Sequence, residues 1–244
     1  MTSRAEDAVA VIGMACRFPG GVNSPEDLWT MLERGRDGTG PIPPGRFDIE
    51  AWFDPDVERP GRIATRRGGF LDGDIGGFDA GFFDVPPAEA EAMDPQIRIL
   101  LELGYEALED AGQDLNRLSG GAHGIYAGVC FSEYHEQLKA STAARPLDAF
   151  FICGTNSCSA SGRLSYHFGF EGPSLTLNAA CSSSLLAVHL ACRDLVSRET
   201  DLALAGGVNL MLSPETFVGF SRLRVLAPDG RCKAFDAAAD GYAR

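Results

Sequence analysis

The stretch that decides the fold is residues 172–184, which read GPSLTLNAACSSS. Its first half is an apolar run typical of a buried strand, and the serines from Ser182 onward are typical of a helix start. Cys181 lies where the two meet, beside the unpaired N–H groups of the helix's first turn. Those groups carry about half a positive charge and favour a thiolate, and cysteines so placed can have pKa values of about 3.5–7.5. We therefore expect Cys181 to be a nucleophile in a strand-to-helix turn.

A structural role is the alternative for Cys181, because most free cysteines are buried and behave as small hydrophobic residues. The neighbouring residues favour the reactive role. Residues 179–184 are all small apart from the thiol itself, so a substrate could approach closely. The turn is similar in outline to the nucleophile elbow of hydrolases, although the G-x-S-x-G motif is absent. The helix that follows has one apolar stripe at helical spacing, formed by Leu185, Val188, Cys192, Leu195 and Val196.

Strands and helices are expected to alternate around this turn. Further buried strands are predicted at residues 8–13, 124–129 and 202–207. Ser24 and Pro25 predict a helix that stops near Gly35, residues 86–111 predict one long helix closed by Gly112, and another helix is expected from Arg163. Strands that are apolar on both faces and alternate with helices predict a layered α/β fold.

Residues 38–81 are rich in glycine and proline but also carry aromatic side chains, which linkers lack. We expect ordered irregular structure there, held by Phe47, Trp52, Phe53, Phe70 and Phe78. The same region holds a basic loop of Arg59, Arg62, Arg66 and Arg67. Two interpretations of this loop stay open: a solvated surface, or a contact for an acidic partner or a phosphate.

Composition excludes several classes of partner. The formal net charge of −13 argues against nucleic acid, which needs clustered Lys and Arg. No apolar run reaches the length of about 18 residues that a membrane span needs, and the N-terminus has no secretory leader. Seven scattered cysteines favour a reducing compartment, and the C-x4-C pair Cys153 and Cys158 does not predict zinc. We expect a cytoplasmic protein without a nucleic-acid, membrane or metal partner.

Several motifs follow one another along the whole chain. They are VIGMACRFPGG at 11–21, TRRGGFL at 65–71, EAMDPQ at 91–96, EALEDAG at 106–112, ACSSSL at 180–185 and LAPDGRCKAF at 226–235. From about residue 8, this series resembles the β-ketoacyl synthase (ketosynthase) domain of type I polyketide synthases. The resemblance covers nearly the whole chain, in one order and with similar spacing.

The resemblance implies a thiolase-like fold, with α-β-α-β-α layers built from two similar halves and usually a homodimer. It implies that Cys181 accepts an acyl chain as a thioester from the phosphopantetheine arm of an acyl carrier protein. A malonyl-type extender would then lose carbon dioxide and attack that thioester in a decarboxylative Claisen condensation. The chain itself would bind no cofactor, since the phosphopantetheine belongs to the partner carrier protein.

Two departures from the family pattern stand out. The family usually has Asp-Thr-Ala-Cys where this chain has Asn178, Ala179, Ala180 and Cys181. The two family histidine motifs, His-Gly-Thr-Gly-Thr and Asn-x-Gly-His, do not occur in the 244 residues. The histidines present are His123, His135, His167 and His189, and none matches a family catalytic position.

The expected organisation is therefore a short N-terminal tail at 1–7 and the N-terminal half of a ketosynthase domain at 8–244, truncated at its C-terminus. The alternative to an active synthase is a catalytically incomplete fragment that serves at most as an acyl-accepting or binding half-domain. A thiolase-like enzyme acting on coenzyme A esters is disfavoured by the near-continuous synthase motifs.

Overall fold

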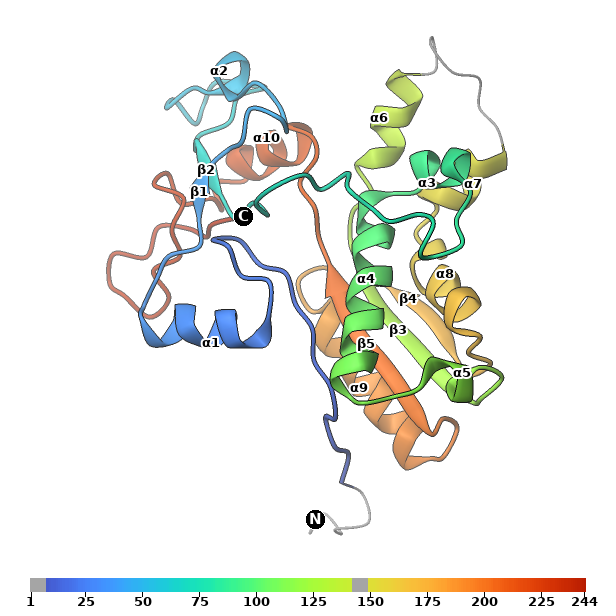
Figure 1. The fold of residues 1–244 in the computed structure, drawn as a ribbon. Helices are drawn as coiled ribbons and strands as arrows, with labels where there is room; N and C mark the ends of the chain where they lie inside the picture. Colours follow the sequence, from blue (N-terminus) through green and yellow to red (C-terminus); the bar gives the residue numbers. More distant parts are fainter. Residues whose placement is uncertain (1–7, 142–148) are drawn as a thin grey trace. The chain divides into compact units, whose positions relative to one another are not determined.

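A computed structural model describes residues 8–141 and 149–244 (Figure 1). The predicted tail at 1–7 lies outside the described residues. The chain divides into two compact units. The first contains Gly76–Asn209 with the N-terminal residues up to Ala15, and the second contains Cys16–Ile75 and Leu210–Arg244.

The first unit is built on a parallel sheet with the strand order β4-β3-β5. Its strands are β3 (His123–Val129), β4 (Ser174–Leu177) and β5 (Leu202–Val208). They confirm the strands predicted at 124–129, within 173–177 and at 202–207. Because the three strands are parallel, their carboxyl ends meet at one edge of the sheet, and Cys181 follows β4 at that edge.

Helices cover both faces of this sheet (Figure 1). On one face, Ile125, Ala127 and Val129 of β3 pack with α4 (Pro95–Asp110) and α8 (Ser159–Phe168) in the main core. On the other face, Tyr126 packs against α9 (Ser183–Val196). Successive strand residues point to opposite faces, so one buried strand supplies both cores. Helix α8 begins at Ser159, earlier than the expected Arg163.

Helix α9 contacts the sheet through small side chains. Ala187 and Ala191 are buried against Tyr126. The apolar stripe noted in the sequence lies elsewhere on the helix: Leu185 is 74% exposed, and Val188 and Val196 are also exposed. Alanine allows the helix axis to approach the strands closely, so Ala187 and Ala191 face the sheet and Leu185, Val188 and Val196 do not.

A buried hydrogen bond ties β3 to α9. The Tyr126 hydroxyl donates to Asp194 Oδ2 at 2.7 Å. This bond, and to a smaller extent the adjacent Arg193, holds the pKa of Asp194 below its ordinary value. Burial, and to a smaller extent the hydrogen bond to the Asp194 carboxylate, raises the pKa of Tyr126. A lowered carboxyl pKa stabilises the fold above the ordinary value of 3.8, and that contribution is lost as the pH falls through the folded value.

Tyr126→Phe is therefore expected to lower the free energy of unfolding at pH 7 by about 1–3 kcal/mol, because the charged carboxylate loses a buried donor. Urea titrations at several pH values measure this loss. The difference from wild type should shrink between about pH 5 and pH 2, where Asp194 becomes protonated. Tyr105→Phe is the matched control, because its hydroxyl bonds Glu109 at the surface and its loss should change little. Equal losses for both variants would contradict this account.

The predicted long helix at 86–111 is wrong, because the structure has two helices there. They are α3 (Pro87–Ala92) and α4, and they are separated at Met93 and Asp94. Pro95 disfavours helical backbone in the residue before it, so α3 must end. Asp94 then caps α4 by accepting from the Gln96 N–H at 2.9 Å, and the Ser132 hydroxyl donates to its other oxygen at 2.8 Å. Burial raises the pKa of Asp94 despite these bonds.

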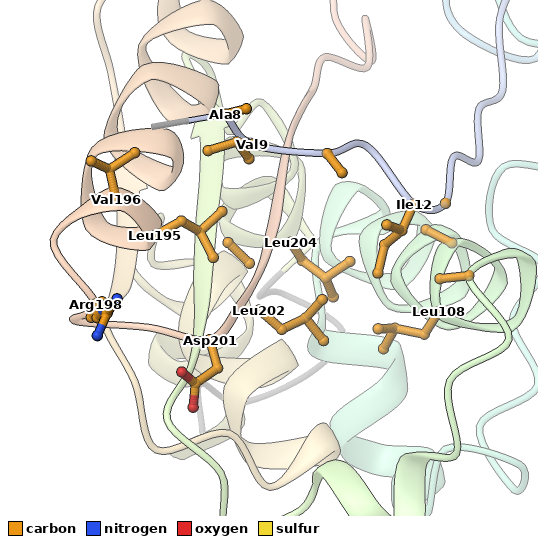
Figure 2. A pocket seen from close by; sticks show the side chains of 15 residues that line it. Ala8, Val9, Ile12, Leu108, Leu195, Val196, Arg198, Asp201, Leu202 and Leu204 are labelled. Atoms are coloured by element: carbon orange, nitrogen blue, oxygen red, sulfur yellow. The ribbon is translucent and has the colours of Figure 1, made fainter. Parts of the chain in front are cut away.

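The predicted buried strand at 8–13 is also wrong. In the described part of the chain this segment has no ladder partner, and Val11 and Ile12 are exposed. Its end is nevertheless fixed, because the Met14 N–H donates to Asp110 at 2.8 Å and a Cβ at Gly13 would lie 2.2 Å from a carbonyl of α4. The segment and strand β5 both line a cavity of about 410 Å³. Figure 2 shows the side chains around it. A strand requires a neighbour to bond, and apolar sequence alone does not supply one.

The second unit confirms irregular structure held by aromatic side chains for most of the predicted stretch, whereas Phe78 packs against the core of the first unit. Ser24 caps α1 (Pro25–Glu33) by accepting from the Asp27 N–H, as predicted. A core of Ile63, Phe70 and Phe217 is joined by Phe47 and Trp52. The regular elements are β1 (Gly40–Pro41) and β2 (Arg67–Gly68), which pair antiparallel, with α2 (Ile49–Trp52) and α10 (Glu215–Arg222).

The remaining helices belong to the first unit. They are α5 (Leu115–Leu118), α6 (Tyr134–Ala140) and α7 (Ala149–Thr155). Among the described residues, no helix combines the length and apolar character required to cross a membrane.

Candidate functional site

Cys181 lies in the short turn that joins β4 to α9. Its side chain is exposed, and Ser182 is the N-cap residue of the 14-residue helix α9. The thiol therefore lies at the positive end of a helix dipole, at the carboxyl edge of a parallel sheet. This edge is where open parallel sheets generally bind ligands.

The residue before Cys181 has an uncommon backbone conformation. Ala180 has a φ of 51°, in the left-handed region that costs a residue with a Cβ about 1–2 kcal/mol. Its N–H donates to Asn178 Oδ1 at 3.1 Å. Its carbonyl oxygen accepts from Cys130 Sγ at 3.0 Å, from Ser183 Oγ at 2.7 Å and from the Ser183 N–H at 3.1 Å. The surrounding bonds hold Ala180 in this conformation.

Ser183 is at the centre of this bonding. The residue is only 4% exposed, and its hydroxyl accepts from the Ala179 N–H at 2.9 Å while donating to the Ala180 carbonyl. Cys130 Sγ lies 3.2 Å from the same hydroxyl. Cys130 directly follows β3, so the turn around Cys181 is fixed to the neighbouring strand as well as to its own helix.

Two glycines let α9 begin this close to the sheet. A Cβ at Gly128 of β3 would lie 2.9 Å from the backbone of Ser183 and Ser184, and one at Gly207 of β5 would lie 2.9 Å from the Ser184 Cβ. Real Cβ atoms rarely come within 3.0 Å of other heavy atoms. Side chains at these two strand positions would push the helix start, and Cys181 with it, away from the strands.

Asn178 replaces the aspartate that the family usually has, and the structure shows how the amide serves here. Its Oδ1 accepts from the Ala180 N–H, and its Nδ2 donates to the Cys130 carbonyl at 3.3 Å. A carboxylate could accept the first bond but could not donate the second. The amide therefore adds another connection between the Cys181 turn and the end of β3.

The four histidines hold structural or surface positions. His123 begins β3, at the opposite end of that strand from Cys130, and its ring lies 5.0 Å from that of Phe170. His135 Nδ1 lies 2.9 Å from Thr155 Oγ1. Burial lowers the pKa of His167, and His189 is exposed on α9.

The arginines of the basic loop bond within the second unit. Arg59 pairs with Asp54 at 2.6 Å, and Arg66 pairs with Glu50 at 2.8 Å. Arg62 donates to the Ala51 carbonyl, and Arg67 donates to the Thr39 carbonyl. The paired side chains of Arg59 and Arg66 are still 59% and 52% exposed, which favours the solvated-surface interpretation over a contact for an acidic partner or a phosphate.

Sequence reasoning did not identify Cys130 and Ser183 as parts of the site. The sequence feature that could have identified Cys130 is its position directly after a predicted strand, because the carboxyl ends of parallel strands lie at the same edge of the sheet. Ser183 stood within the SSS run without a feature that separated it from Ser182. Their shared contact with the Ala180 carbonyl depends on the fold, which brings together residues 50 or more positions apart in the sequence.

Comparison with known proteins agrees with this geometry. The family model "Beta-ketoacyl synthase, N-terminal domain" matches residues 6–244. The chain is 53% identical over 237 residues to mycoketide-CoA synthase of Mycobacterium tuberculosis, and 52% identical over the same length to the polyketide synthase GfsA of Streptomyces halstedii. Each match covers 97% of this chain, but only 6% and 3% of those proteins.

Solved ketosynthases share the fold. A ketosynthase domain of oxazolomycin biosynthesis from Streptomyces albus matches with a TM-score of 0.88 and 35% identity, over 96% of this chain and 40% of that one. The module 6 ketosynthase of the Bacillus subtilis bacillaene synthase matches with a TM-score of 0.85 and 37% identity, over 96% and 38%. These matches confirm the prediction that the chain has the N-terminal half of a thiolase-like α/β fold. The chain belongs to the β-ketoacyl synthase family, as the N-terminal part of a ketosynthase domain of the polyketide synthase type.

Proposed function

We propose that this chain accepts an acyl group on Cys181 as a thioester, the first step of β-ketoacyl synthesis. The observation that carries the proposal is an exposed thiol at the N-terminus of α9, in a turn fixed by Cys130 after β3, Asn178 after β4 and Ser183 in α9. The acyl donor is a thioester on the phosphopantetheine arm of an acyl carrier protein. Family membership supports this donor.

The acyl transfer takes place at the thiol and the backbone of the Cys181 turn. The Cys181 thiolate attacks the carbonyl carbon of the acyl thioester, and a carbon–sulfur bond forms. The tetrahedral oxyanion accepts a hydrogen bond from the Cys181 backbone N–H. The bond to the phosphopantetheine sulfur then breaks, and that thiolate leaves and takes up a proton from solvent. Thiolates are good nucleophiles and good leaving groups, so the transfer is reversible.

The second step belongs to the complete ketosynthase reaction. A malonyl-type extender on a carrier protein loses carbon dioxide, and its carbanion attacks the thioester on Cys181. The product is a β-ketoacyl thioester on the carrier, and the Cys181 thiolate is released. Family membership supports this step and the homodimer usual in the family. The chain spans 37–40% of three solved ketosynthases that it matches, and the family histidine motifs do not occur in its 244 residues.

Incubation of the purified chain with a hexanoyl thioester of pantetheine or of acyl carrier protein tests the first step. Intact-protein mass spectrometry should show one added hexanoyl group, and hydroxylamine, which cleaves thioesters, should remove it. Faster loading from the carrier protein than from free pantetheine would support carrier recognition. A chain that gains no acyl group from either donor would leave only the binding half-domain interpretation.

A further inference from the structure

We propose that Ser183 and Cys130 are positioning residues that aim the Cys181 N–H at the oxyanion of the acyl-transfer transition state. This inference rests on the proposed function, because it concerns how that step is accelerated. It starts from the three hydrogen bonds on the Ala180 carbonyl, which come from Cys130 Sγ, Ser183 Oγ and the Ser183 N–H.

The Ala180 carbonyl and the Cys181 N–H belong to the same peptide group. A trans peptide is planar, and its N–H points in the direction opposite to its C=O. Bonds that fix the Ala180 oxygen toward the junction of β3 and α9 therefore fix the Cys181 N–H toward the opposite side. The two side chains set the direction of this donor without touching the substrate.

The same bonds also strengthen the donor. A carbonyl that accepts hydrogen bonds polarises its peptide group, and connected hydrogen bonds reinforce one another. The Cys181 N–H is thus a better donor than an N–H whose peptide carbonyl is free. The effect is greatest when the acceptor is a full oxyanion, which exists only near the transition state.

The backbone of Ala180 shows why such fixing is needed. Its left-handed φ of 51° is unfavourable for alanine, so without its bonds this residue would relax toward negative φ. That relaxation would rotate the following peptide and turn the Cys181 N–H away. Ser183 is buried, so its hydroxyl does not compete with water for the Ala180 oxygen.

The test compares two reactions of Cys181. Acylation by a pantetheine thioester passes through an oxyanion, whereas alkylation by iodoacetamide is a displacement at carbon that forms none. Ser183→Ala is expected to slow acylation about tenfold while leaving alkylation within about twofold. The expected loss is smaller than the 10²–10³-fold effect of deleting an oxyanion donor, because the N–H is retained.

Three further variants sharpen the test. Ser182→Ala is the matched control, because the Ser182 hydroxyl donates to the Ala179 carbonyl at 2.8 Å and not to the peptide of Cys181. It should acylate at the wild-type rate. Cys130→Ala should slow acylation several-fold, and Cys130→Ser, which keeps a donor, should restore most of the rate.

The outcomes separate this inference from the function on which it rests. A wild-type chain that is alkylated but never acylated overturns the proposed function. A wild-type chain that is acylated, with Ser183→Ala equally fast, overturns only the positioning role. If acylation and alkylation of Ser183→Ala fall together, the serine holds the turn in a general structural way, which also contradicts the inference. A thermal melt of each variant confirms that the compared chains are folded.

Discussion

Replacing Cys181 with alanine is expected to reduce acyl-adduct formation by at least about 10³-fold, the scale at which enzymes lose activity without their nucleophile. Cys181 is the exposed thiol at the start of α9, and the other cysteines lie outside this turn. Because its side chain is exposed, its loss should leave the free energy of unfolding nearly unchanged. Rates of adduct formation by mass spectrometry, paired with a urea titration, measure both effects.

Cys192→Ala is the matched control for this prediction. Cys192 lies on the same helix and is partly buried, so it tests whether any thiol on α9 accepts the acyl group. This variant should load at the wild-type rate. An acyl adduct that persists in Cys181→Ala and disappears in Cys192→Ala would show that Cys192 is the acceptor and would contradict this prediction.

Gly128→Ala is expected to lower the free energy of unfolding by about 1–3 kcal/mol, the usual cost of overpacking a well-packed core. The new Cβ would lie 2.9 Å from the backbone of Ser183 and Ser184, so helix α9 or strand β3 must move. Movement of the helix start would also displace Cys181. We therefore expect Gly128→Ala to slow acylation as well as to lower the free energy of unfolding. Urea titration and adduct formation measure the two consequences.

Gly206→Ala provides the comparison for Gly128→Ala. Gly206 is also a strand glycine at the carboxyl end of the sheet, but a Cβ there meets no atom within 4 Å. Its stability should equal or slightly exceed that of wild type, because alanine restricts the unfolded chain. If both variants lost the same free energy, the close approach of α9 to β3 would not be the cause.

Features set by local sequence could be predicted. The apolar runs of β3 and β5, the Ser24 cap of α1 and the turn at Cys181 each follow from a few adjacent residues. The error at residues 8–13 arose because a distant neighbour decides the structure: the segment has the composition of a strand but no strand to pair with in the described chain. The error at residues 86–111 was local, because the apolar spacing continues across Pro95 although the proline separates α3 from α4.

The site divides in the same way. Cys181 could be identified from its strand-to-helix context and from the family motif around it. Cys130 and Ser183 could not, because their role depends on the direction of one carbonyl in the folded turn. The role of the amide at Asn178 could not be predicted either, because it depends on the folded turn, where the side chain accepts one hydrogen bond and donates another.

Peptide mapping of the acylated wild-type chain tests the central claim most directly. Trypsin cleaves after Arg163 and Arg193, so the peptide 164–193 contains Cys181 and Cys192 and no other cysteine. After reaction with a hexanoyl thioester, fragmentation of this peptide should place one hydroxylamine-sensitive hexanoyl group on Cys181. An unmodified Cys181 in a folded chain, or a hexanoyl group on another cysteine, would contradict the account.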